Sequence, residues 1–196
     1  MSQPGASYHH GDLRAACVRA ARELLEEDGG SGMSLRAVAR RAGVSPTAPY
    51  RHFADRDALV SAVAAQGYRD LTEHLAAAHP APPATSDDLA DIAVAYVRFA
   101  LDRPAMFRVM FAEPCDPASE ERAAAIAAIS GYLHSLVRSA FPGCDPEPLA
   151  TAVWALVHGL AFLHLDGKFD TSTPQQAADR VRSAIYALFS PASTTP

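Results

Sequence analysis

Apolar residues recur about every 3.6 positions along almost the whole chain, and this period restricts the fold more than any other feature. One such stripe begins at Leu13 and Cys17, and others follow as far as Phe189. Strands would alternate apolar and polar residues with a period of two, and neither that alternation nor an internal repeat is found. The sequence therefore predicts an all-α fold.

Turn and capping residues divide the stripes into separate helices. Ser34 is expected to cap a short helix that ends at Gly43, because a tight turn needs a residue that tolerates positive φ. Ser45 is expected to cap the next helix, with Pro46 at its first position. A longer helix follows Asp55 and ends at the Pro-rich segment 79–84, which indicates a hinge between two parts of the chain.

The charges of the chain are unevenly distributed. The 196 residues carry a net charge of −5, which alone would disfavour a nucleic-acid partner. Residues 34–56, however, contain five arginines and one aspartate, a balance of +4, whereas residues 57–196 contain nine basic and sixteen acidic groups. Phosphate binding depends on the local field, so the basic segment is compatible with DNA, although such a cluster can also be only a solvated face.

Three features set the expected compartment. No uncharged apolar run of about 18 residues is evident, so we expect no membrane span and no membrane partner. Residues 1–11 lack the order of a signal peptide, and three cysteines at irregular spacing predict no disulfide framework. The sequence is expected to belong to a cytoplasmic protein.

The run from Ser34 to Phe53 has the spacing of a helix-turn-helix. Two short helices must cross steeply if the second is to enter a major groove about 12 Å wide. This crossing needs a small residue at the contact, a glycine at the turn and an apolar residue after it, and Ala39, Gly43 and Val44 meet those needs. Pro49 removes one hydrogen bond from the second helix, which is therefore expected to be short and tight. The alternative is a helical hairpin that binds nothing.

The second of these helices offers side chains suited to base edges and phosphate oxygens. Its exposed face is expected to carry Ser45, Thr47, Ala48, Tyr50, Arg51 and His52. Arg36 adds positive charge, and Arg56 lies where a phosphate could also meet the N-terminus of the following helix. We therefore predict a DNA-binding surface here.

At these residues the sequence resembles the TetR family of repressors, from Tyr8 to about Leu71. Tyr50 and Phe53 match the Tyr-x-x-Phe end of that family's recognition helix, whereas Pro49 replaces its usual leucine. The resemblance implies that Ser34, Thr47, Tyr50 and His52 contact DNA, partly through phosphates. It also implies a homodimer formed by the last two helices and a small-molecule pocket in each subunit.

The second half resembles the C-terminal ligand-binding domain named for its Trp-His-Gly residues, here Trp154, His158 and Gly159. The candidate pocket residues are Phe99, Met106, Phe107, Met110, Trp154, His158 and Phe162. Clustered Met and Phe suit an adaptable apolar pocket, but the aromatic run is core by default, and His158 could equally be a packed core histidine.

Together these readings predict two domains and one principal function. Residues 10–70 are expected to form a three-helix DNA-binding domain with its motif at 34–53, and residues 86–190 a helical ligand-binding and dimerisation domain, followed by a disordered tail at 191–196. The predicted function is that of a transcriptional regulator, a repressor released by a small, mostly apolar ligand, on near-palindromic double-stranded DNA. The alternative is a ligand-free DNA-binding or architectural protein of the same fold.

Other classes of function find little support in the sequence. No set of catalytic groups and no Gly-rich phosphate loop is present, so we expect neither an enzyme nor a cofactor. His134, His158 and His164 lack metal-ligand spacing, and we expect no metal site. Thiol redox sensing through Cys115 or Cys144 stays open, because thiol reactivity depends on a pKa that sequence does not show.

Overall fold

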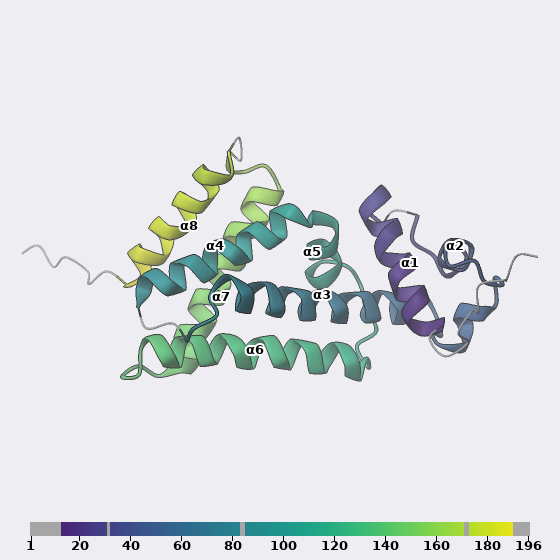
Figure 1. Cartoon of the computed structure of the whole chain (residues 1–196), viewed down its shortest axis with the longest axis horizontal. Coiled ribbons are helices and arrows are strands. Elements are labelled where there is room, and N and C mark those ends of the chain that lie inside the picture. The colour runs from purple at the N-terminus through teal and green to yellow at the C-terminus, as the bar shows by residue number, and fades with distance from the viewer. Residues whose placement is uncertain (1–12, 31, 83–84, 171–172, 190–196) are drawn as a thin grey trace, which may run out of the picture.

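The computed structural model describes residues 13–30, 32–82, 85–170 and 173–189, and within these ranges every regular element is a helix (Figure 1). The predicted tail at 191–196 and the first residues of the predicted domain at 10–70 lie outside these ranges. The elements are α1 (Leu13–Asp28), α2 (Leu35–Arg41), the 3₁₀ helix η1 (Ala48–Arg51), α3 (Arg56–Ala78), α4 (Ser86–Asp102), α5 (Pro104–Phe111), α6 (Glu120–Ala140), α7 (Pro146–Leu165) and α8 (Pro174–Phe189). The predicted all-α fold is confirmed.

Side-chain caps start several helices at the predicted positions. The hydroxyl of Ser34 accepts a hydrogen bond from the backbone N–H of Ala37 at 3.2 Å, and the carboxylate of Asp55 accepts one from Ala58 at 2.9 Å. Such caps satisfy N–H groups that the helix itself leaves without partners, and each stabilises a helix by about 1 kcal/mol. The same device begins α8, where the hydroxyl of Thr173 accepts from Gln176 at 3.3 Å.

The helix predicted from Ser45 and Pro46 differs from what the structure contains. Only Ala48–Arg51 is helical, as a single 3₁₀ turn, and the side chain of Thr47 at its N-terminus makes no capping bond. Pro46 and Pro49 lack N–H groups, so the segment cannot build a run of α-helical bonds. The prediction of a helix starting at Pro46 was wrong, and the prediction of a short, tight one was confirmed.

Helix α3 connects the two parts of the molecule. In Figure 1 it runs from the small end that contains α1 and α2 into the larger bundle, where it lies alongside α6. Leu59 and Val63 belong to its N-terminal half, Leu71 and Leu75 to its C-terminal half, and all four are fully buried. One continuous helix thus packs into the core of the small end and into the core of the larger bundle, and the two cores join in a single buried cluster.

Helix α4 is the central element of the larger bundle. It is buried at ten positions between Leu89 and Ala100, and it packs against α3, α5, α7 and α8. The capping box formed by Thr85 and Asp88 starts it. A helix buried on most of its surface fixes the positions of its neighbours, so α4 places α7 with respect to α3.

Helix α7 corrects the expectation about apolar runs. By length and composition it could cross a membrane, with a mean hydropathy of 1.5 in an 18-residue window that is only 28% buried. Ala150, Val157 and Ala161 nevertheless pack into the core, as does His164 at 3% exposure. Helix α7 is therefore a core helix on one side, and it carries a bare apolar surface on the other.

Candidate nucleic-acid interface and ligand cleft

The turn after α2 has the geometry that the helix-turn-helix spacing predicts. Gly43 has a φ of +68°, a conformation that other residues rarely adopt. The backbone N–H of Val44 then bonds to the carbonyl of Ala39 at 3.0 Å, closing the turn against the end of α2. The chain leaves this turn toward the exposed segment 45–52.

Successive tight turns hold the segment that follows. The N–H groups of Ala48, Tyr50 and His52 each bond to the carbonyl three residues earlier, at 3.0, 3.3 and 3.0 Å. Phe53 is 2% exposed and Pro49 is also buried, so the segment is anchored at its C-terminal end. The guanidinium of Arg14 lies 5.6 Å from the centre of the Phe53 ring, which fastens that anchor to α1. Docking and not α-helical bonding thus fixes the shape of this surface.

The structure brings most of the predicted DNA-contacting side chains onto one exposed segment. Tyr50 is 52% exposed, the largest value among the exposed large hydrophobic side chains in the described part of the chain. Ser45, Thr47, Arg51 and His52 are exposed beside it, and Ala48 is half-buried. A hydroxyl pair, Ser45 Oγ and Thr47 Oγ1, lies 3.4 Å apart at the start of the segment.

Fewer positive charges are available on this surface than the count of arginines in the sequence implies. Arg41 forms ion pairs with Glu27 and Glu23 of α1, and these carboxylates offset its positive charge. The hydrogen bonds to the same carboxylates raise the pKa of its guanidinium. Arg56 bonds to the carbonyl of Met33 at 3.3 Å and lies 3.4 Å from a carboxylate oxygen of Glu113.

We call the exposed side chains of residues 34–53 the reading surface. Three of its arginines form no ion pair among the described residues: Arg36, Arg40 and Arg51. Arg40 was not predicted as a contact. Its position four residues after Arg36 on α2 was the available signal, because residues four apart share a helix face.

The predicted ligand residues separate into two groups. Phe99, Met106, Phe107 and Met110 are at most 5% exposed and lie in the core. Trp154, His158 and Phe162 are half-buried on α7. Phe107 connects the two groups, since its ring centre lies 5.7 Å from that of His158 and 5.5 Å from that of Phe162. Phe99, Met106, Phe107 and Met110 therefore belong to the packed core next to α7, and none of them lines the two spaces described below.

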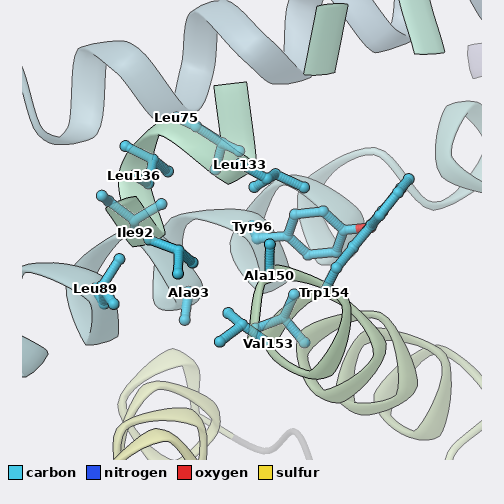
Figure 2. A pocket seen from close by; sticks show the side chains of 12 residues that line it. Leu75, Leu89, Ile92, Ala93, Tyr96, Leu133, Leu136, Ala150, Val153 and Trp154 are labelled. Carbon is cyan, nitrogen blue, oxygen red and sulfur yellow. The ribbon is translucent and has the colours of Figure 1, made fainter. Parts of the chain in front are cut away.

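An inner hollow lies between α3, α4, α6 and α7 (Figure 2). Its volume is about 30 Å³, and its lining consists of Leu75, Leu89, Ile92, Ala93, Tyr96, Leu133, Leu136, Val137, Ala150, Val153, Trp154 and Val157. Figure 2 shows Tyr96 and Trp154 together at one end of it, with the tyrosine hydroxyl directed at the indole. A hollow of this size holds one or two water molecules at most.

A larger cleft of about 310 Å³ lies on the other side of Trp154, between α3, α5 and α7. It is lined by Tyr68, Phe111, Thr151, Trp154, Ala155 and His158. Trp154 lines both spaces and therefore forms the partition between them. Trp154 and His158 were predicted from the sequence, whereas Tyr68 and Tyr96 were not, because no local signal distinguishes them from other residues of their helices.

Three polar groups form a chain beside the cleft. The indole N–H of Trp154 donates to Tyr96 Oη at 3.3 Å, and Tyr96 Oη lies 3.1 Å from Nδ1 of His158. Burial lowers the pKa of His158 and raises the pKa of Tyr96, so both groups are neutral near pH 7. His158 is thus neither a charged residue nor a fully buried core histidine.

The other candidate chemistries gain no support from the geometry. No group of three or more His, Cys, Asp or Glu side chains among the described residues has the arrangement of a metal site. Cys17 is fully buried and burial raises the pKa of its thiol, whereas Cys115 is half-buried and Cys144 exposed.

Comparisons with known proteins agree with both halves of this description. The family model described as "Bacterial regulatory proteins, tetR family" matches residues 18–63, and the model "Tetracyclin repressor-like, C-terminal domain" matches residues 89–188. An HTH-type transcriptional regulator of Mycobacterium tuberculosis, Rv1816, is 33% identical over 104 residues, which are 52% of this chain and 44% of that protein. The chain thus matches less than half the length of that relative.

Solved structures extend the likeness over the whole fold. A Rhodococcus sp. RHA1 protein of unknown function is 32% identical, with a TM-score of 0.77 over 95% of this chain and 98% of that one. A TetR-family transcriptional regulator from Pectobacterium atrosepticum, 20% identical, shares the fold with a TM-score of 0.70 over 89% of this chain and 91% of its own. With its N-terminal helices, here called the head, matched by one family model and just over half of its length by the other, the chain belongs to the TetR family of DNA-binding bacterial transcriptional regulators.

Proposed function

We propose that this regulator is a cytoplasmic repressor that binds a near-palindromic operator as a homodimer and leaves it when a small, mostly apolar molecule binds the second half. The observation that carries the proposal is the pairing of exposed arginines, which form no ion pair among the described residues, near the N-terminus of α3 with a cleft that Tyr68 lines in the middle of the same helix. A regulator needs both a reading surface and a site that senses a signal, and one helix joins the two here.

The dimer part of the proposal rests on the bare side of α7. Ala152, Leu156, Gly159 and Leu163 follow one another at spacings of four, three and four residues, and each is at least partly exposed. A Cβ on Gly159 would meet nothing within 4 Å, so this side of α7 is open to a close partner. Together with Tyr186 and Leu188 of α8, at 38% and 41% exposure, it offers an apolar face for a symmetric four-helix contact.

Two copies are also what specific DNA recognition requires. A single head reads only a few base pairs, and two heads related by a two-fold axis contact half-sites about 34–36 Å apart on near-palindromic DNA. A ligand can release such a dimer only by binding more tightly to the conformation that does not fit the operator. A difference of about 1–3 kcal/mol lowers operator affinity roughly 5- to 150-fold. No catalytic role is part of this proposal.

The alternative function is DNA binding without a ligand, by the same fold. A second half filled with packed side chains would favour it, and the inner hollow of about 30 Å³ is indeed nearly filled. The cleft of about 310 Å³, with a hydrogen-bonding group in its wall, favours the sensor instead, because it reaches the size of small-molecule pockets.

Selection of DNA from a random pool by the full-length protein tests the DNA-binding and dimer parts directly. We expect enriched sequences with two inverted half-sites separated by whole turns of the double helix. Trp154→Phe and His158→Ala should leave this binding nearly unchanged while they blunt release by an effector. If the pool shows no enrichment, or if half-sites are selected singly, the operator proposal is refuted.

A further inference from the structure

We propose that the ligand site is the outer cleft between α3, α5 and α7, not the inner hollow, and that it takes an apolar molecule without positive charge whose carbonyl oxygen accepts a hydrogen bond from Nε2–H of His158. This inference rests on the proposed function of the second half as a sensor. It adds the location of the site and the chemical class of the ligand.

The hydrogen bonds of Tyr96 decide which nitrogen of His158 carries the proton. An indole N–H can only donate, so Tyr96 Oη accepts from Trp154. The hydroxyl proton of Tyr96 has no other acceptor among the described residues, so we assign it to Nδ1 of His158, 3.1 Å away, with Nδ1 as the acceptor. A neutral imidazole with an accepting Nδ1 has its proton on Nε2.

The Nε2–H group is left for a ligand. Nε2 of His158 has no hydrogen-bond partner among the described residues, and it is not one of the fully buried polar atoms without partners. His158 lines the outer cleft and does not line the inner hollow, so this donor faces the cleft. Its position is fixed from below by the ring of Phe111, whose centre lies 4.6 Å away in an edge-to-face arrangement.

The other polar groups of the cleft wall are already donors to the protein. The hydroxyl of Tyr68 donates to the carbonyl of Met110 at 2.8 Å, and that of Thr151 donates to the carbonyl of Glu147 at 3.0 Å. His158 is therefore the one free donor among the lining residues, and a matching ligand must bring an acceptor.

Charge in and around the cleft selects against cations. No Asp or Glu lines the cleft, so a buried ammonium would lose its hydration without gaining a counter-ion. Arg122, on α6, lies close enough to Tyr68 to lower the pKa of its hydroxyl, against the larger effect of burial, and it adds positive potential beside the cleft. A carbonyl compound or a carboxylate meets these conditions, and an amine does not.

The proposed dimer face leaves this cleft open. Thr151, Trp154, Ala155 and His158 lie on a side of α7 that is roughly 120° from the apolar stripe of Ala152 and Gly159, at 100° per residue. Binding in the cleft and dimer formation thus use different sides of the same helix.

Matched naphthalene compounds test the chemical class on the full-length protein without DNA. 2-Acetylnaphthalene presents a ketone, 2-ethylnaphthalene has the same shape without an acceptor, 2-naphthoate has a carboxylate and 2-naphthylmethylamine a cation. By calorimetry we expect the ketone to bind roughly 3- to 10-fold more tightly than the hydrocarbon, as one net hydrogen bond gives, and the amine to bind most weakly. An amine that binds best, or no binding of any of the four, would overturn the proposal. The naphthoate measurement distinguishes a neutral carbonyl from a carboxylate as the preferred source of the oxygen.

Variants of His158 test the donor. His158→Phe should remove the preference for the ketone while the affinity for 2-ethylnaphthalene stays within about 2-fold, whereas His158→Gln, which keeps an N–H donor, should retain part of the preference. A His158→Phe protein that still prefers the ketone contradicts the assignment. Nitrogen-15 spectra of His158 supply a second readout, in which Nε2 must be protonated and Nδ1 not. The single tryptophan gives one indole signal, which reports that the variants keep their fold.

Filling each space separately tests the location. Ala155→Phe should lower the affinity for 2-acetylnaphthalene more than about 10-fold by occupying the outer cleft, and Ala93→Val, which fills part of the inner hollow, should change it less than about 2-fold. The reverse order would place the site in the hollow and refute the proposal. These measurements are made without DNA, and the affinity for operator DNA is measured separately. A ketone that binds in the cleft without changing operator affinity confirms the site and refutes only the release mechanism.

Discussion

A Cβ built on Gly67 of α3 would lie 2.7 Å from Sδ of Met110 on α5 and 2.8 Å from its Cγ. Both residues are buried, and Met110 is fully so. The missing side chain at Gly67 is therefore what lets α5 lie directly on α3. Since α5 also supplies Phe111 to the cleft, this contact sets the distance between the cleft and the helix that joins it to the head.

Gly67→Ala is expected to destabilise the protein despite the better helix propensity of alanine. Alanine in a helix interior gains about 1 kcal/mol over glycine, but overpacking a filled core costs about 1–3 kcal/mol. We expect a net loss of roughly 1 kcal/mol in the free energy of unfolding, measured by urea denaturation. Gly131→Ala is the control, since Gly131 is exposed in α6 with nothing within 4 Å of a Cβ, and it should stabilise. Equal effects of the two changes would show that the contact with Met110 is unimportant.

Arg51→Ala and Arg41→Ala should differ although both remove one positive charge from the head. Arg51 has no ion pair among the described residues, so its loss should weaken operator binding roughly 10-fold. Arg41 is bound to Glu23 and Glu27, and its loss should change affinity less than about 2-fold. Fluorescence anisotropy with labelled operator measures both, and comparable losses would mean that Arg41 leaves its partners to reach DNA.

Salt dependence gives a separate measure of the reading surface. Three arginines in each subunit form no ion pair among the described residues, and together they can neutralise about six phosphates in a dimer. At roughly 0.9 per phosphate, the slope of log affinity against log salt should be near −5. A slope near zero on every duplex would contradict phosphate contacts altogether. In Arg36→Ala and Arg40→Ala dimers the slope should become shallower by about 2 each, one unit for each subunit.

A charge at the apolar end of α8 should prevent dimer formation. Ala187 and Leu188 are exposed in the single chain, so Ala187→Glu or Leu188→Glu should leave its folding nearly intact and give monomers that lose operator binding. Analytical ultracentrifugation measures the state of assembly. Gln175→Glu, at the exposed start of the same helix, serves as the charge-matched control and should remain dimeric. A stable monomer in the unmodified protein would refute the proposed dimer.

The junction between α3 and α4 should stabilise the protein mainly at low pH. Nδ1 of His79 lies 2.6 Å from the carbonyl of Ala81 and Nε2 lies 3.0 Å from the carboxylate of Asp88, so the doubly protonated ring satisfies both acceptors. These contacts raise the pKa of His79 above 6.5, first through the Ala81 carbonyl. Its contribution is therefore fully present below pH 6.5 and is lost as pH rises through the raised value.

The check is the difference in free energy of unfolding between the unmodified protein and His79→Gln, measured from pH 5 to pH 9. This difference should shrink as pH increases. A difference that grows with pH would show that the neutral ring is the stabilising form.

The helix boundaries were predictable because local chemistry determines them. Ser34, Asp55 and Thr173 cap their helices through side-chain oxygens whose partners lie three residues further along the chain. The period of 3.6 likewise required helices throughout. The 3₁₀ turn at Ala48–Arg51 was only half predicted, since the effect of Pro49 was seen and that of Pro46 was taken for a helix start.

The cleft was predictable only in part, because it depends on contacts between distant segments. Trp154 and His158 share a helix, and their spacing shows that they can share a face. Tyr96 is 58 residues from Trp154 and 62 from His158, and nothing local distinguishes it from the core residues around it. The same limit applies to Arg41, which the sequence counts as a charge of the head and which the fold joins to α1.

The length of α3 has a mechanical consequence. Its 23 residues span about 35 Å at 1.5 Å per residue. A rigid rod of that length that tilts by roughly 5° about its C-terminal end moves about 1.3 Å beside Tyr68 and about 3 Å at Arg56. That distance is close to the rise of one base pair, so a movement smaller than a bond length beside Tyr68 is enough to put a head out of step with the groove it reads.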